Sequence, residues 1–151
     1  MLSNAAQYAI RATLYLAMNT DETQKVRVRE IANDLECPQP FLAKLMQQLS
    51  NKKLVSSAKG PTGGFYLSKK DRGKTVWDIL IAVDGSEKFM RCFMGLSECS
   101  DLNPCPAHAT FAPFKQKIIS EFKDQTIAAF AEKIRLNGAV ISLKDFNALE
   151  D

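Results

Sequence analysis

The sequence has no long apolar run, and its 151 residues include only one histidine, one tryptophan and four cysteines. A membrane-spanning helix needs about 20 predominantly apolar residues in a row, so we expect neither a membrane span nor a membrane partner. The first residues, Met1-Leu2-Ser3-Asn4, place no basic segment before an apolar one, so we expect no signal peptide. Few cysteines and no export signal indicate a reducing, cytoplasmic location, where disulfides are rare.

Motifs that serve catalysis are also missing. There is no Cys-x-x-Cys pair, and His108 is the single histidine available for acid–base chemistry. The glycines between Gly60 and Gly64 precede a predicted strand rather than a helix, which is a poor arrangement for binding nucleotide phosphates. We therefore expect no enzyme and no small-molecule substrate. A redox catalyst that uses Cys105 or Cys37 is the least favoured class.

Charge is distributed unevenly along the chain. Residues 1–74 contain 12 Lys and Arg against 6 Asp and Glu, a balance of +6, whereas residues 75–151 contain 8 against 11, a balance of −3. A basic first half predicts contact with a polyanion such as nucleic acid, although charge alone fits an ordinary solvated surface equally well. From this charge balance and from the motifs described below, we divide the chain into three regions. They are a DNA-binding region (residues 1–74), a region that contains the cluster-binding loop and the dimerisation helices (75–136), and a C-terminal tail (137–151).

The first half has the pattern of three helices followed by a β-hairpin. Apolar residues recur at helical spacing over residues 4–18, 26–35 and 38–49, and Ser3 or Asn4 can cap the first of these helices. Two short strands, residues 54–58 and 65–67, flank a turn rich in glycine. This order predicts a winged helix-turn-helix: a mainly α fold with a small β-hairpin wing.

In such a motif the second helix enters the major groove of DNA, and here that is the helix over residues 38–49. Its outward amide and lysine side chains can hydrogen-bond to bases or phosphates, and the glycines of the wing allow backbone to approach phosphate closely. The predicted DNA-binding residues are Arg11, Gln39, Pro40, Lys44, Gln47, Gln48, Lys59, Gly60, Pro61, Thr62, Gly63 and Gly64. Because a winged helix is a fold and not a function, a domain that binds only proteins is the alternative.

The second half predicts helices over residues 75–84, 107–122 and 127–134, with an irregular segment over residues 90–106. The helix over 107–122 is long and carries an apolar stripe at steps of three and four. Its members are Phe111, Phe114, Ile118, Ile119 and Phe122. Packing inside one chain is the simplest interpretation of this stripe, and a homodimer interface explains it nearly as well.

Three of the four cysteines lie in or beside this irregular segment. Cys92, Cys99, Cys105 and His108 have the spacing Cys-x6-Cys-x5-Cys-x2-His. Thiolates and an imidazole gathered so closely are typical ligands of soft metals. The long, irregular gaps favour an iron–sulfur cluster, and a structural zinc ion held by three Cys and one His is the alternative. Cys37 stands apart, and we expect it to be a small buried residue at a turn.

Several of these segments resemble one family of bacterial regulators, that of IscR, NsrR, RirA and CymR. Tyr8-Ala9-Ile10-Arg11-Ala12 is similar to their opening helix, and Lys59-Gly60-Pro61-Thr62-Gly63-Gly64-Phe65 to their wing. Cys105-Pro106-Ala107-His108 is similar to the end of the IscR cluster loop. The resemblance extends from residue 1 to about residue 135.

The resemblance implies a dimeric transcription regulator that binds a pseudo-palindromic double-stranded DNA operator and senses iron, redox or nitric-oxide status. It implies that Cys92, Cys99 and Cys105 hold an iron–sulfur cluster. His108 matches the histidine of the IscR site, which favours [2Fe–2S] over [4Fe–4S]. Gln7 stands where the family's nitric-oxide sensor has an acidic ligand, and an amide is a poor substitute. A winged-helix DNA-binding protein with a structural zinc site and no sensing function is the alternative.

Overall fold

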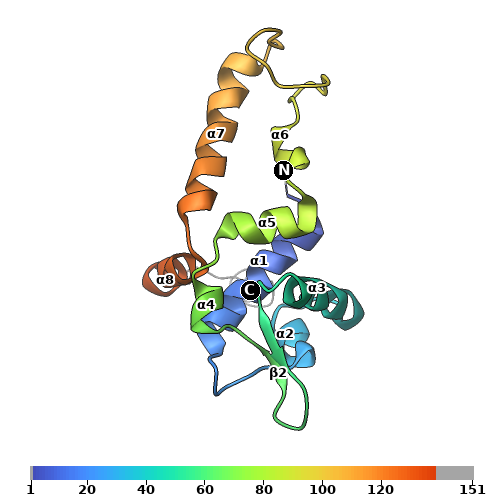
Figure 1. Cartoon of the computed structure of the whole chain (residues 1–151), viewed down its shortest axis with the longest axis vertical. Coiled ribbons are helices and arrows are strands. Elements are labelled where there is room, and N and C mark those ends of the chain that lie inside the picture. Colours follow the sequence, from blue (N-terminus) through green and yellow to red (C-terminus); the bar gives the residue numbers. More distant parts are fainter. Residues whose placement is uncertain (1, 139–151) are drawn as a thin grey trace, which may run out of the picture.

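The computed structural model describes residues 2–138, which form eight helices and one antiparallel hairpin (Figure 1). Most of the predicted tail over 137–151 lies outside the described residues. The elements in chain order are α1 (Asn4–Asn19), α2 (Val28–Asp34), α3 (Gln39–Asn51), β1 (Ser56–Ala58), β2 (Gly64–Tyr66), α4 (Lys69–Arg72), α5 (Val76–Asp84), α6 (Glu87–Met90), α7 (His108–Asp124) and α8 (Ile127–Asn137).

Side-chain caps explain where the main helices begin. The hydroxyl of Ser3 accepts a hydrogen bond from Ala6 N at 3.0 Å, which satisfies one of the free N–H groups at the start of α1. Thr75 caps α5 and Thr126 caps α8 in the same way. These two capping residues also pair with each other in an antiparallel bridge. The turn before α8 is thereby fixed to the turn before α5.

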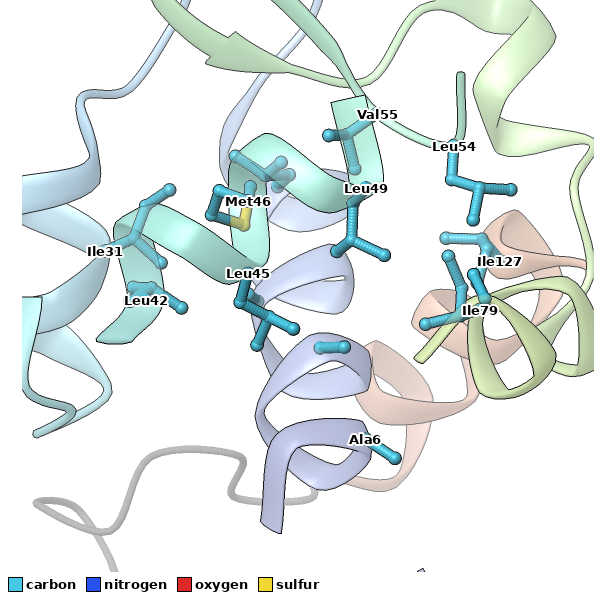
Figure 2. Packing of buried hydrophobic residues seen from close by; sticks show 14 of the residues in the cluster. Ala6, Ile31, Leu42, Leu45, Met46, Leu49, Leu54, Val55, Ile79 and Ile127 are labelled. Carbon is cyan, nitrogen blue, oxygen red and sulfur yellow. The ribbon is translucent and has the colours of Figure 1, made fainter. Parts of the chain in front are cut away.

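One hydrophobic core joins the predicted DNA-binding region to the region that follows it. The buried faces of α1, α2 and α3 meet residues of α5 and α8 in a single cluster (Figure 2). Ile79 of α5 and Ile127 of α8 lie next to Leu54, which follows α3. Ala6, Ala9 and Ala12 of α1 are fully buried, and their small side chains allow neighbouring helices to approach closely.

The prediction of a helix over residues 26–35 is wrong at its start. Residues 26 and 27 precede α2, and Val26 instead pairs with Phe65 through two backbone hydrogen bonds, of 2.9 and 2.7 Å. The apolar spacing of Val26 fits a helix, but its N–H and C=O groups are used to extend the wing. The short helices α4 and α6 were not predicted, because four residues are too few to show a period.

A long arm stands away from the core. Figure 1 shows α7 rising from the turn before α8, with α6 and the irregular segment 91–107 beside it and above it. Within the described residues, α7 packs mainly on α5, so its apolar stripe is only partly covered and Phe114 is 51% exposed. None of the helices within residues 2–138 combines the length and apolar character that crossing a bilayer requires.

Candidate nucleic-acid interface and metal centre

Helix α3 presents one polar face to solvent. Pro40, Lys44 and Gln47 follow one another at steps of four and three, and all three are exposed. Asn51, one turn further on, continues this face, and its side-chain oxygen accepts a hydrogen bond from Gln47 Nε2 at 3.1 Å. Sequence reasoning missed Asn51, although the same spacing identifies it. The opposite face is buried in the core through Leu42, Leu45, Met46 and Leu49.

Gln48 and its neighbour Lys52 lie on the flank of α3 that faces α5. Gln48 Nε2 and Lys52 Nζ both donate hydrogen bonds to the backbone carbonyl of Ala82, at 2.9 and 2.6 Å. That carbonyl belongs to the last turn of α5. Each side chain therefore uses one of its N–H donors within the protein in this conformation.

Arg11 of α1 lies close to the beginning of α3. Its guanidinium lies over the ring of Tyr8, 5.4 Å from the centroid. Tyr8 in turn makes an edge contact with Phe41 of α3, with the ring centroids 5.7 Å apart. The nearby Cys37 is buried at the turn between α2 and α3, as predicted, and burial raises the pKa of its thiol.

The tip of the wing is fixed by an arginine. One guanidinium nitrogen of Arg27 donates hydrogen bonds to the carbonyls of Gly60 and Pro61, both at 2.9 Å. Arg27 directly precedes α2, so the wing is attached to the start of the helix-turn-helix. Lys59 and Thr62 lie exposed in the same loop.

The last two glycines of the wing are required by the protein's own backbone. A Cβ atom on Gly63 would lie 2.3 Å from the carbonyl oxygen of Ala58, and one on Gly64 would lie 2.6 Å from that of Val26. Gly64 also has a φ of +143°, a conformation that favours glycine. Gly60 has a φ of +101° but open space around it. Of these three glycines, only Gly60 leaves space beside its Cα atom, where another surface can approach the backbone.

A basic groove of about 420 Å³ lies between the end of α3, the hairpin and α4. Lys53, Lys70 and Lys74 line it together with several hydroxyl groups. The one carboxylate among its lining residues, that of Asp71, is buried and accepts hydrogen bonds from Ser56 and Ser68. With that acidic side chain bonded inside the protein, the groove offers ammonium and hydroxyl donors of the kind that contact phosphate.

The four predicted metal ligands lie in two pairs. In the first pair, Cys92 and Cys105 are both buried and share a hydrogen bond. Burial acts to raise the pKa of the Cys92 thiol, but backbone N–H groups of Leu96, Met94 and Gly95 and the Cys105 thiol all donate to its sulfur, and the net shift is downward. The loop therefore favours a thiolate at Cys92, which is the form that binds metal.

In the second pair, Cys99 Sγ lies 3.5 Å from Nδ1 of His108, the first residue of α7. The other ring nitrogen, Nε2, lies 2.7 Å from a carboxylate oxygen of Asp101. Over residues 2–138 no three His, Cys, Asp or Glu side chains are close enough together to hold a single ion. The donor set fits a soft metal in its chemistry, and a single ion bound by both pairs would require the loop between them to rearrange.

Comparison with known protein families matches residues 2–133 to Rrf2, described as "Iron-dependent Transcriptional regulator". The chain belongs to the Rrf2 family. Over 129 residues it is 40% identical to an HTH-type transcriptional regulator of Aquifex aeolicus (strain VF5), covering 84% of this chain and 88% of that protein. It is 29% identical over 126 residues to the HTH-type transcriptional regulator IscR of Klebsiella pneumoniae (strain 342), covering 83% and 76% of the two chains.

Two solved structures share the Rrf2 fold. The global cysteine regulator CymR of B. subtilis matches with a TM-score of 0.71 at 19% identity, over 88% of this chain and 97% of that one. IscR of T. potens matches with a TM-score of 0.68 at 20% identity, over 93% and 92%. The predicted winged-helix fold and the relation to IscR and CymR are confirmed. This Rrf2 protein is a DNA-binding transcription regulator and not an enzyme.

Proposed function

We propose that this Rrf2 protein is a homodimeric regulator that senses iron, redox or nitric-oxide status through an iron–sulfur cluster, with [2Fe–2S] favoured. Cys92, Cys99, Cys105 and His108 would be the ligands. The observation that supports this proposal most strongly is that three thiols and the chain's one imidazole occur within a single arm between α6 and the start of α7, where backbone N–H groups lower the pKa of the Cys92 thiol. When bound, the cluster would supply a site that gains or loses an electron or is dismantled by oxidants.

For the DNA contact, the exposed polar face of α3 and the attached tip of the wing support the exposed members of the predicted binding set, whereas Gly63 and Gly64 are required by the protein's own backbone. A double-stranded operator would receive α3 in its major groove, with base contacts from Lys44 and Gln47. The tip of the wing, held by Arg27, would contact the backbone nearby. A dimer with two such surfaces would require a pseudo-palindromic operator with half-sites about one helical turn apart.

For the dimer, the arm supplies the apolar surface. Phe114 of α7 and the large apolar side chains of the neighbouring loop are exposed in the single chain. Those in the loop and at its start are Met90, Phe93, Met94, Leu96 and Leu102. A group of exposed apolar side chains is typical of a surface that a partner covers. Pairing of two α7 helices would bury this surface and bring two cysteine loops near the dimer axis.

A continuous set of contacts connects the cysteine loop to α3. Lys115 of α7 donates a hydrogen bond to the carbonyl of Met90, at the end of α6 and the start of the loop. Helix α6 follows directly on α5, whose Ala82 carbonyl holds Gln48 and Lys52 near the end of α3. Ordering or release of the loop can therefore shift the population between DNA-competent and incompetent dimers. A coupling of about 1–3 kcal/mol suffices for a several-fold to hundredfold change in affinity.

The test is anaerobic purification followed by visible absorption and by iron, sulfide and zinc analysis. We expect a coloured protein with iron and acid-labile sulfide, whose ratio gives the cluster type, and DNA affinity that changes when the cluster is removed. A colourless protein with one zinc ion per chain and unchanged DNA binding would support the structural zinc alternative. If only a metal-free protein is obtained, failure to reconstitute a cluster from iron and sulfide would contradict the sensing function.

A further inference from the structure

One carboxylate of the cysteine loop contacts a predicted ligand. The Nε2 atom of His108 lies 2.7 Å from Oδ1 of Asp101, seven residues earlier. A carboxylate can only accept a hydrogen bond, so the proton of this pair lies on Nε2. In the neutral ring this leaves the lone pair on Nδ1, and Nδ1 is the atom that faces the sulfur of Cys99 at 3.5 Å.

The local backbone brings this pair together. Ser100 Oγ accepts a hydrogen bond from the N–H of Leu102, which closes a tight turn around Asp101. The Asp101 side chain is 98% exposed and therefore remains fully solvated, whereas the His108 side chain is only 13% exposed. The turn thus brings a solvated carboxylate against one edge of a largely buried ring, while the other edge points to a thiol.

This arrangement is the one by which proteins orient histidine ligands. A metal-bound imidazole almost always donates its other N–H to a carboxylate, carbonyl or water, which fixes the tautomer and raises the basicity of the ligating nitrogen. We propose that Asp101 is a positioning residue, which holds His108 with Nδ1 directed at the cluster and makes that nitrogen a stronger donor. This inference rests on the proposed function, because it requires His108 to be a ligand.

The experiment compares Asp101→Asn with the reconstituted wild type. Asparagine keeps the size of the side chain but removes its charge. A weaker imidazole donor stabilises the oxidised iron less, so we expect the reduction potential of the cluster to rise. Loss of such an outer contact typically weakens metal binding about 10- to 100-fold, so we also expect iron to be lost to a chelator faster by a factor within that range.

Two further variants separate this effect from simple charge removal. Glu98→Gln removes an exposed carboxylate of the same loop beside Cys99, and we expect a much smaller change of potential. Asp101→Glu restores the carboxylate and should return the potential toward the wild-type value. Pulsed electron paramagnetic resonance of the reduced cluster reports the coupling to a histidine nitrogen, which should persist but change in magnitude in Asp101→Asn.

The outcomes distinguish the two proposals. A wild-type cluster that shows histidine coupling, together with an Asp101→Asn variant identical to Glu98→Gln, would overturn the positioning function and leave the sensing function intact. A wild-type cluster without any nitrogen coupling would overturn the positioning function and the assignment of His108 as a ligand. A protein that holds zinc alone, or that takes up no cluster, would overturn both proposals.

Discussion

Asp84, the last residue of α5, accepts hydrogen bonds from both the backbone N–H and the hydroxyl of Ser3, the N-cap of α1. Lys88 of α6 adds a third contact to the same carboxylate, at 3.2 Å. Asp84 is only 5% exposed through its side chain. One carboxylate thus connects α1, in the predicted DNA-binding region, to the two helices that lead into the cysteine loop.

The Ser3–Asp84 contact predicts a specific dependence of stability on pH. Burial acts to raise the pKa of Asp84, but the hydrogen bonds from Ser3 and the charge of Lys88 outweigh it, so the pKa lies below its ordinary value. A lowered pKa stabilises the folded protein above the ordinary value of about 4, and this contribution is lost as the pH falls through the folded-state pKa. Asp84→Asn should cost about 1–3 kcal/mol at neutral pH.

Urea unfolding of wild type and Asp84→Asn checks this prediction, at neutral pH and in steps from about pH 5 to pH 3. The difference between the two proteins should shrink toward the acid end. Asp124→Asn, which changes an exposed carboxylate at the end of α7, is the matched control and should have little effect. A constant difference at every pH would mean that the ionised form of Asp84 contributes nothing.

The attachment of the wing to Arg27 predicts an effect on DNA affinity with little effect on stability. Arg27→Lys keeps the positive charge but loses the geometry by which one guanidinium nitrogen reaches both carbonyls. We expect DNA binding to weaken by about 1 kcal/mol, roughly fivefold in Kd, with an unchanged salt dependence. Fluorescence anisotropy with a labelled operator measures both quantities. Arg29→Lys, at another exposed arginine, should bind like wild type. Equal losses in the two variants would show that the attachment of the wing to Arg27 does not contribute to DNA binding.

The two kinds of glycine in the wing should respond differently to substitution. Gly64→Ala places a Cβ atom 2.6 Å from a backbone oxygen of Val26, so the bridge between Val26 and the hairpin must shift. Gly60→Ala meets no neighbouring atom and carries only the strain of a positive φ, about 1–3 kcal/mol. Thermal unfolding should therefore show a larger loss for Gly64→Ala. An equal loss in both would indicate that the wing can move away from Val26 at no cost.

The sequence predicts the starts of elements that are marked by residues near them in the chain, and the structure confirms this at α1 and α5, whereas α3 runs two residues past its predicted end at Leu49. Ser3 and Thr75 cap their helices through side chains that the local sequence already identifies. Val26 was misassigned because its partner, Phe65, lies 39 positions away (65 − 26), and helical spacing contains no information on strand pairing.

In the candidate site, too, some features follow from the local sequence and others depend on residues that are distant in the chain. Helical periodicity predicts the exposed face of α3, which the structure shows, and cysteine spacing predicts a donor set that stays a prediction. The hydrogen bond from Gln48 to the Ala82 carbonyl could not be predicted, because it depends on how α5 lies against α3. The pairing of Cys92 with Cys105 and of Cys99 with His108 likewise depends on the path of an irregular loop, for which the sequence has no period to read.

The basic groove beside the wing predicts contacts that supply affinity without sequence preference. Each ammonium group that neutralises a DNA phosphate releases a counterion, so Lys70→Gln and Lys74→Gln should each lower the slope of log Kd against log salt by about one. Both should weaken binding equally for operator and random duplexes. Lys44→Gln, on the outward face of α3, should instead lose about 1–3 kcal/mol of discrimination between sequences.

Anisotropy titrations at several salt concentrations separate these behaviours, with Lys133→Gln on the exposed side of α8 as the control for removing one positive charge. If Lys133→Gln reduces the slope as much as the groove variants, the effect is one of net charge and the groove holds no phosphate. If Lys70→Gln alters sequence preference instead, the groove lies against base edges and α3 must enter the DNA at a different angle. The predicted combination, a lower slope with unchanged preference, requires α3 and the groove to contact the same duplex at once, one reading bases and the other holding the backbone.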